Sequence, residues 1–286
     1  MKIKEVSSKK QNNTHIDWVS VLLRGGVIFS AAVTVTVLVF IILYILIRGV
    51  PHLSPKLFAL EYNSSNLSLL PALINTFLIT GISLLFAVPI GIFSAIYLVE
   101  YAKRGNKVVG IIRITSETLS GIPSIVYGLF GMLFFVTALK WKISILSGAA
   151  TLAIMVLPLI MRTTEEALKA VPDSFREGSF GLGAGRLRTV FRIVLPAAAP
   201  GILSGIILSV GRIVGESAAL IFTAGSVAEL PKSLFDSGRT LAVHLYNLSS
   251  EGLHVDEAFA TAVVLLVLVV FINWGSRKLA KCLTKA

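Results

Sequence analysis

Arg212 and Glu216 are the residues whose types and spacing most readily suggest chemistry, because two opposite charges stand one helical turn apart in an apolar stretch. A guanidinium inside a lipid bilayer costs about 3 to 15 kcal/mol, depending on how the cost is counted, so Arg212 needs a partner or an aqueous path. One interpretation is that the two charges neutralise each other. The other, which we favour, is that Arg212 offers its planar fork of donors to a tetrahedral oxyanion, with Glu216 orienting it and Ser217 alongside.

Glu117 and Ser124 form a second polar region. Glu117 lies one turn after Arg113, and this spacing fits a solvated ion pair at a helix end as well as a gating contact. The segment 120–124 then interrupts an apolar run with glycine, proline and hydroxyls. A helix restarted at Ser124 could turn its first amides toward an anion. A simple proline kink explains the same residues equally well.

Other chemistries are excluded by what the chain lacks. It has one cysteine, and its four histidines do not show the HExxH spacing of a zinc site. It also lacks the GxxxxGK[ST] loop that cradles nucleotide phosphates. We therefore predict no catalytic residue, no metal site, no cofactor bound by this chain and no enzymatic activity of its own.

The elements that carry the polar residues must lie in a membrane. Of the 286 residues, 55% are hydrophobic and 14% charged, and the mean hydropathy is +0.85. Apolar windows of roughly 20 residues match the ~30 Å thickness of a bilayer core. The predicted fold class is therefore all-α, a polytopic membrane protein with six transmembrane helices. The predicted spans are 27–48, 71–99, 114–139, 143–161, 197–222 and 258–276, with tails at 1–26 and 277–286 and a loop at 162–192.

The basic residues predict the orientation of these spans. Nineteen of the 26 Lys and Arg residues fall on the side of the N-terminus, six fall on the other side, and Arg212 lies within a span. Since cytoplasmic loops carry an excess of Lys and Arg, we expect both termini in the cytoplasm. The net charge of +11 is then a signature of topology in a lipid bilayer, and we expect no nucleic-acid partner.

The cytoplasmic loop 162–192 has the composition of a helical hairpin. Proline, aspartate and serine at 172–174 are typical of a helix start, so we predict a helix over Ser174–Leu182. Glycines at 181, 183 and 185 end it, and a second helix is expected over Leu187–Val194. Both helices carry apolar residues that a plain connection would not need. This favours a docking surface, although a hairpin lying on the lipid surface is the alternative.

Seven positions in and after this loop keep a fixed spacing. They are Glu177, Gly178, Ser179, Gly183, Ile193, Leu195 and Pro196. The pattern resembles the coupling motif of ABC importer permeases, EAA-x3-G-x9-I-x-LP, with Gly178 and Ser179 replacing two alanines. The resemblance implies a fold like that of type I ABC importer permeases, in which this helix docks on a nucleotide-binding subunit.

Three further stretches, at 116–128, 211–217 and 220–224, are similar to the PstA family of phosphate permease subunits. This resemblance implies ATP-driven import of inorganic phosphate across a bacterial inner membrane. The implied partners are a PstC-type second permease, a PstB-type ATPase dimer that uses the ATP, and a PstS-type extracytoplasmic phosphate-binding protein. Alternatives are a permease for another oxyanion, such as sulfate or molybdate, or for another small solute, and a secondary transporter or channel. Whether two identical or two different permeases pair stays open.

Overall fold

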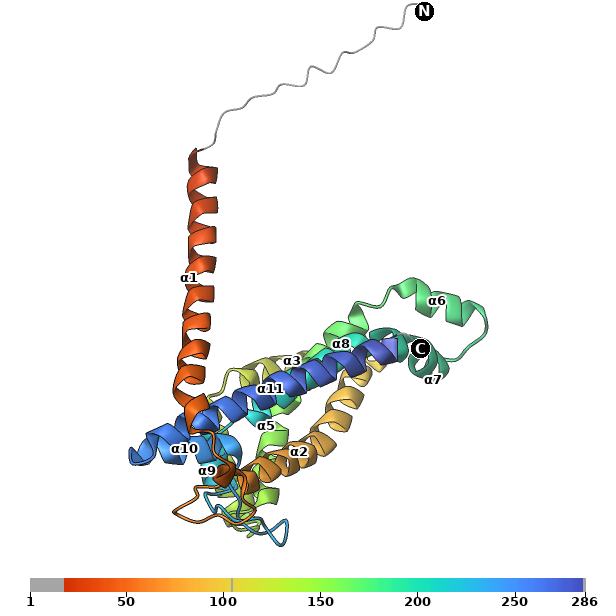
Figure 1. The fold of residues 1–286 in the computed structure, drawn as a ribbon. Coiled ribbons are helices and arrows are strands. Elements are labelled where there is room, and N and C mark those ends of the chain that lie inside the picture. Colours follow the sequence, from red (N-terminus) through yellow and green to blue (C-terminus); the bar gives the residue numbers. More distant parts are fainter. Residues whose placement is uncertain (1–17, 104, 285–286) are drawn as a thin grey trace, which may run out of the picture. The chain divides into compact units, whose positions relative to one another are not determined.

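The computed structural model describes residues 18–103 and 105–284, which form helices and loops without any strand (Figure 1). Most of the expected tail 1–26, and the end of the expected tail 277–286, lie outside the described residues. The chain divides into two compact units, one ending at Ile47 and the other beginning at Arg48. The first contains most of α1 (Trp18–Gly49), which is long and apolar enough to cross a membrane.

Four more helices, all in the second unit, are long and apolar enough to cross a membrane. They are α2 (Leu70–Ile96), α5 (Ile145–Lys169), α8 (Leu195–Val214) and α11 (Val255–Thr284). With α1 they make five candidate spans, and a bent helix pair makes the sixth if it counts as one span. The expected all-α membrane fold is therefore confirmed. Two π-helical segments extend these helices, η3 (Tyr97–Tyr101) after α2 and η5 (Val190–Val194) before α8.

α5 is the helix on which α2, α4, α8 and α9 pack, and about two-thirds of its most apolar window is buried. Small residues allow the close approach. A Cβ added at Gly91 of α2 would lie 2.7 Å from the side chain of Ile160, and one at Gly148 would lie 2.7 Å from that of Ala224. Carbon atoms pack at about 3.5–4.0 Å, so these contacts require glycine.

The expected third span, 114–139, is broken in the middle. α3 (Lys107–Ser120) ends at the predicted interruption, α4 (Ser124–Gly131) restarts after it, and the two axes differ by 104°. The π-helical segment η4 (Met132–Ala138) continues α4. The Tyr127 hydroxyl donates a hydrogen bond to the Leu119 carbonyl across the break, at 2.8 Å, and so holds the bend.

The fifth span is also interrupted, in contrast to the continuous helix expected over 197–222. α8 ends at Val214, and the short helix α9 (Ala218–Thr223) follows after three residues. Glycine at 215 ends α8, because it is a poor helix former and leaves the last turn exposed to competing hydrogen bonds. Glu216 and Ser217 consequently belong to a turn between two helices.

The loop after α5 is helical, as the sequence indicates. α6 (Asp173–Gly181) is followed by a turn and by α7 (Arg186–Thr189), which runs through η5 into α8. α5 itself continues past the expected end at 161 to Lys169. Figure 1 places α6 and α7 at one end of the second unit, and α9 and α10 (Leu241–Glu251) at the other.

A buried polar cluster ties the connecting segments together at the α10 end. The Arg239 guanidinium lies 4.5 Å over the Tyr62 ring, and that ring meets the His244 ring edge-on at 6.2 Å. Asn75 of α2 donates a hydrogen bond to the Arg239 carbonyl at 3.3 Å. The nearby connections also hold two short 3-10 helices, η1 (Val50–His52) and η2 (Pro55–Phe58).

Candidate functional site

The break between α8 and α9 separates Arg212 from Glu216, so the ion pair proposed in the first interpretation is absent. The Glu216 side chain is buried in the turn, where Oε1 accepts a hydrogen bond from the Ala219 amide at 3.1 Å. It therefore caps the first turn of α9. The sequence argument assumed a continuous helix, and Gly215 breaks the spacing on which an i,i+4 pair depends.

Arg212 is half-buried near the end of α8 and makes no ion pair or side-chain hydrogen bond with any residue that the structure describes. It interacts electrostatically with Tyr127 of α4. Ser124 begins α4 one turn before Tyr127 and is half-buried. Ser217 is half-buried at the start of α9, and its hydroxyl does not cap that helix. Arg212 thus keeps its donors available, as binding to an anion requires.

The packing of α4 on α9 holds these residues near one another. A Cβ added at Gly128 would lie 2.8 Å from the Ala219 Cα atom, so the two backbones are in direct contact. Because Ala219 is also the residue capped by Glu216, the cap lies where α4 packs against α9. Arg212, Glu216 and Ser217 therefore lie near α4, although Arg212 and Glu216 do not form an ion pair.

Glu117 lies apart from this group and does not bind Arg113. Arg113 instead contacts Glu165 of α5, with Nη2 2.6 Å from Oε1, and Lys169 Nζ lies 2.6 Å from the same oxygen. Glu117 is exposed and lines a small cavity beside these residues. The buried Glu165 outcompetes it because a carboxylate screened less by water attracts a guanidinium more strongly. No group of His, Cys, Asp or Glu among the described residues is arranged to hold a metal ion.

The coupling positions lie on α6 and on the turn after it. Glu177 and Gly178 are exposed, and Ser179 is joined to Thr189 of α7 by a hydrogen bond of 2.8 Å between their hydroxyls. Gly183 has a φ of +80°, a left-handed conformation that glycine adopts without steric cost. This glycine lets α7 fold back beside α6. Ile193 is partly exposed in η5, and Leu195 and Pro196 begin α8.

The hairpin of α6 and α7 exposes apolar side chains. No residue of α6 is buried, and Leu182 is 92% exposed. A groove of about 470 Å³ runs between the two helices, lined by both small and basic residues. The apolar residues at least one-third exposed are Phe175, Phe180, Leu182, Leu187, Phe191 and Ile193. An exposed apolar patch of this kind marks a surface for another protein or for lipid.

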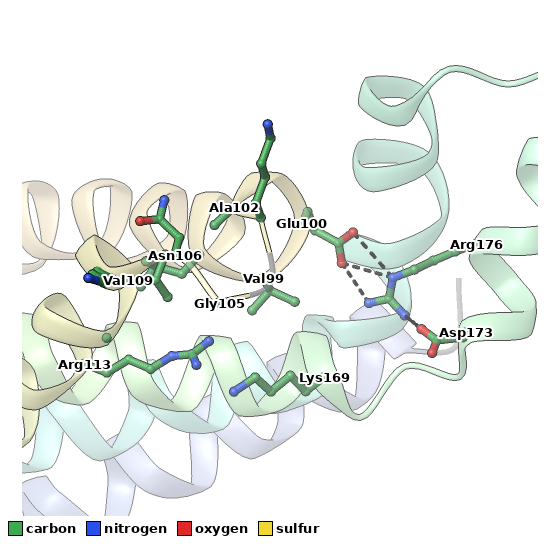
Figure 2. Close-up of a pocket in the computed structure, with 14 residues that line it drawn as sticks. Val99, Glu100, Ala102, Gly105, Asn106, Val109, Arg113, Lys169, Asp173 and Arg176 are labelled. Atoms are coloured by element: carbon green, nitrogen blue, oxygen red, sulfur yellow. Dashed lines mark hydrogen bonds and ion pairs between the residues drawn. The ribbon is translucent and has the colours of Figure 1, made fainter.

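Arg176 attaches this hairpin to the membrane helices. Its guanidinium contacts the Glu100 carboxylate in η3, with Nη2 2.7 Å and Nε 3.1 Å from Oε1 (Figure 2). It also donates hydrogen bonds to the carbonyls of Leu168 and Val171. It also contacts Asp173 at 3.2 Å. The side chains of Arg176 and Glu100 are only 14% and 9% exposed. Sequence reasoning missed this contact, although a carboxylate at the end of an apolar run was a signal for it.

A family model described as a binding-protein-dependent transport system inner membrane component matches residues 87–281. The chain belongs to this family. The match contains α5, the α6–α7 hairpin and the α8–α9 break. Membership implies a multi-pass inner-membrane subunit that assembles with a second permease, an ATPase and a binding protein.

Relatives named for transport agree with this family. The chain is 36% identical over 282 residues to the probable ABC transporter permease protein YqgI of Bacillus subtilis, covering 92% of this chain and 96% of YqgI. It is 34% identical over 231 residues to the phosphate transport system permease protein PstA of Haemophilus influenzae, covering 80% and 81%. It is 38% identical over 190 residues to PstA of Pasteurella multocida, covering 65% and 67%.

Solved structures with the same fold are ABC importers. A bacterial alginate ABC transporter superposes with a TM-score of 0.68 at 16% identity, covering 93% of this chain and 98% of that chain. The MetNI methionine ABC transporter superposes with a TM-score of 0.59 at 20% identity, covering 75% and 93%. At these identities the likeness establishes the fold, which is that of the membrane subunits of ABC importers.

Proposed function

We propose that this permease is the PstA-type subunit of an ATP-driven importer of inorganic phosphate. The PstA-named relatives support phosphate as the cargo. The observation that carries the proposal in the structure is Arg212, a half-buried guanidinium without an ion pair among the described residues. Its fork of donors matches the oxygens of a tetrahedral anion, and a charge with no internal partner is free to take one from the cargo.

The proposed partners follow from the same relatives. A PstC-type permease completes the pathway, a PstB-type ATPase dimer hydrolyses ATP, and a PstS-type protein delivers phosphate from outside. The chain itself then binds no cofactor. Closure of the ATPase pushes on the α6–α7 hairpin, and the Arg176–Glu100 contact passes the displacement to α2. The membrane helices alternate between two arrangements, and Arg212 faces one side of the membrane and then the other.

The proposed orientation puts α6 and both termini in the cytoplasm. Lys and Arg are concentrated on that side of the predicted spans, and the C-terminal end of α11 lies at the α6 end of the second unit (Figure 1). A docking surface for an ATPase must face the cytoplasm, since ATP is there. The exposed apolar hairpin and the charge distribution therefore agree on one orientation.

The test is uptake of radiolabelled phosphate by cells that carry Arg212→Gln, normalised to inserted protein. Glutamine keeps hydrogen bonding but loses the charge and the fork, so uptake should be abolished while assembly with the ATPase persists. Arg48→Gln, at an exposed arginine, is the matched control and should transport normally. Glu216→Gln should also keep transport, because an amide oxygen can still cap α9.

Two outcomes would contradict the proposal. Wild-type uptake by the double variant Arg212→Leu with Glu216→Leu would mean that both residues are only structural. Uptake that excess sulfate or molybdate inhibits as strongly as unlabelled phosphate would assign the permease to oxyanions in general rather than to phosphate.

A further inference from the structure

Two cavities lie next to each other along α3, at the end of the membrane helices that faces α6. The first, called the basic cavity here, has a volume of about 820 Å³ between the η3–α3 turn, the end of α5 and the start of α6 (Figure 2). Its lining is rich in charge. The charged residues are the cations Lys103, Lys107, Arg113, Lys169 and Arg176 and the anions Glu100 and Asp173.

The cations of the basic cavity are not balanced by the carboxylates around them. Arg176 forms ion pairs with both Glu100 and Asp173. Figure 2 shows Arg113 and Lys169 turned toward one another, and both contact a single oxygen of Glu165 at 2.6 Å. The Arg113 Nε atom is buried without a hydrogen-bond partner among the described residues.

The two remaining lysines of the basic cavity also lack partners. Lys103 and Lys107 are exposed and make no ion pair with any described residue. Together with Arg113 and Lys169 they bring four cations to the basic cavity, of which only Arg113 and Lys169 contact a carboxylate, that of Glu165. The first turn of α3 lines the same cavity, and the positive end of its helix dipole adds to the excess. The basic cavity therefore attracts an anion.

The second cavity is apolar and has a volume of about 610 Å³. α3 forms a wall of both cavities, because Val109 and Gly110 line the basic cavity while Ile111 and Ile112 line the apolar one. Leu98 of η3 lines both. Apolar side chains from α2, η3, α3 and α5, among them Phe93, Leu119, Leu157 and Met161, form most of the remaining wall of the apolar cavity. A ligand with an anionic head and an apolar tail matches the pair.

We infer that the two cavities together bind one anionic phospholipid. Its phosphate group lies in the basic cavity and an acyl chain lies in the apolar cavity. The positive charge of the basic cavity favours an anionic lipid. The ammonium group of a zwitterionic lipid would face Lys103 and Lys107 and be repelled by them. The bound lipid would fill the space between α3, α5 and the Arg176–Glu100 contact, so it would brace the attachment of α6. The inference rests on the membrane fold and does not depend on the cargo.

Two variants separate the shape of the site from its charge. Gly110→Leu adds a side chain at the wall of the basic cavity, at a position where an added Cβ meets no atom within 4 Å. Lys103→Gln with Lys107→Gln removes two charges at exposed positions. Gly81→Leu is the matched control, because Gly81 also has open space around its Cβ but lines neither cavity.

The experiment uses the full chain with its partner subunits in phosphatidylcholine vesicles that contain photoreactive phosphatidylglycerol as the minor lipid. Cross-linked peptides should come from 93–119 and 157–161. Each basic side chain near an anionic lipid changes binding about fivefold, so the double glutamine variant should lose about 25-fold in labelling. Gly110→Leu should abolish labelling, and Gly81→Leu should keep it.

Three outcomes would overturn the inference. The first is equal labelling by photoreactive phosphatidylcholine, which would mean that charge does not select the lipid. The second is unchanged labelling in Gly110→Leu, which would place the probe elsewhere. The third is displacement of the lipid by inorganic phosphate alone, which would assign the basic cavity to a free anion.

Discussion

Replacing Arg176 by methionine should detach α6 from the membrane helices. Methionine retains most of the apolar length of the side chain but removes the charge and every donor. The variant leaves Glu100 buried without its partner, at 9% exposure, and two carbonyls, those of Leu168 and Val171, without their donors. Removing one member of a buried ion pair costs about 3–5 kcal/mol. Since α6 has no buried residue, this contact and the Ser179–Thr189 hydrogen bond are its polar side-chain links to the neighbouring elements among the described residues.

The assay is hydrogen exchange of the α6 backbone amides in the purified complex. A loss of about 3 kcal/mol in the local opening free energy accelerates exchange by about 150-fold, which is far outside experimental error. Arg188→Met, at an exposed arginine of α7, is the matched control and should leave α6 unchanged. Phosphate uptake should fall in Arg176→Met while ATP hydrolysis continues, because the hairpin no longer moves α2.

The double variant Arg176→Met with Glu100→Leu makes this prediction refutable. A buried ion pair replaced by apolar residues of similar volume often regains the lost stability. Protection of α6 should therefore recover in the double variant, although the link between α6 and α2 loses its polar specificity. If the losses of the two single variants simply add in the double variant, Arg176 and Glu100 do not act on each other, and the reasoning fails.

Gly183→Val should abolish coupled uptake while the protein stays in the membrane. A φ of +80° costs a β-branched residue roughly 1–2 kcal/mol, so the turn should change conformation and displace α7 from α6. Normal uptake and normal co-purification of the ATPase would contradict this prediction. Acidification should destabilise the fold through His244, since burial and the neighbouring Arg239 charge lower its pKa to about 3. The unfolded chain binds the proton first, so stability is complete above about pH 6.5 and lost below it, by about 2 kcal/mol at pH 5. The free energy of unfolding, measured in detergent at pH 6.5 and at pH 5, should fall less in His244→Gln than in the unmodified protein. In a Cys282→Ser background, a cysteine at Ser65 should react with an impermeant thiol reagent added outside intact cells, and a cysteine at Ser179 should not react. The reverse result would contradict the proposed orientation.

The features that depend on local pattern could be predicted from the sequence. Apolar windows of sufficient length gave the membrane helices, since a helix is the form that satisfies its backbone in lipid. Proline, aspartate and glycine gave the start of α6 and its turn, because these residues act on their own backbone. The break between α3 and α4 was likewise signalled by Gly121 and Pro123.

The pairing of charges could not be predicted, because residues four apart in sequence are neighbours only while the helix between them is continuous. Gly215 ends α8 and Glu216 caps α9, so Arg212 lacks the carboxylate that one interpretation of the spacing assigned to it. Arg113 turns to Glu165 on another helix, and Arg176 meets Glu100 across 76 residues of chain. Contacts of this kind arise from tertiary packing, which one sequence does not display.

In the π-helical segments the number of residues matters for the fold as much as their types do. In η3 the Ala102 amide bonds to the Tyr97 carbonyl, five residues back, so this turn holds one residue more than an α-helical turn. Deleting one residue there would leave a regular α-helix of equally apolar residues. It would also rotate the side chains that follow it in this turn by about 100° and turn Glu100 away from Arg176. Natural insertions and deletions should therefore be absent from 97–101, even where substitutions accumulate.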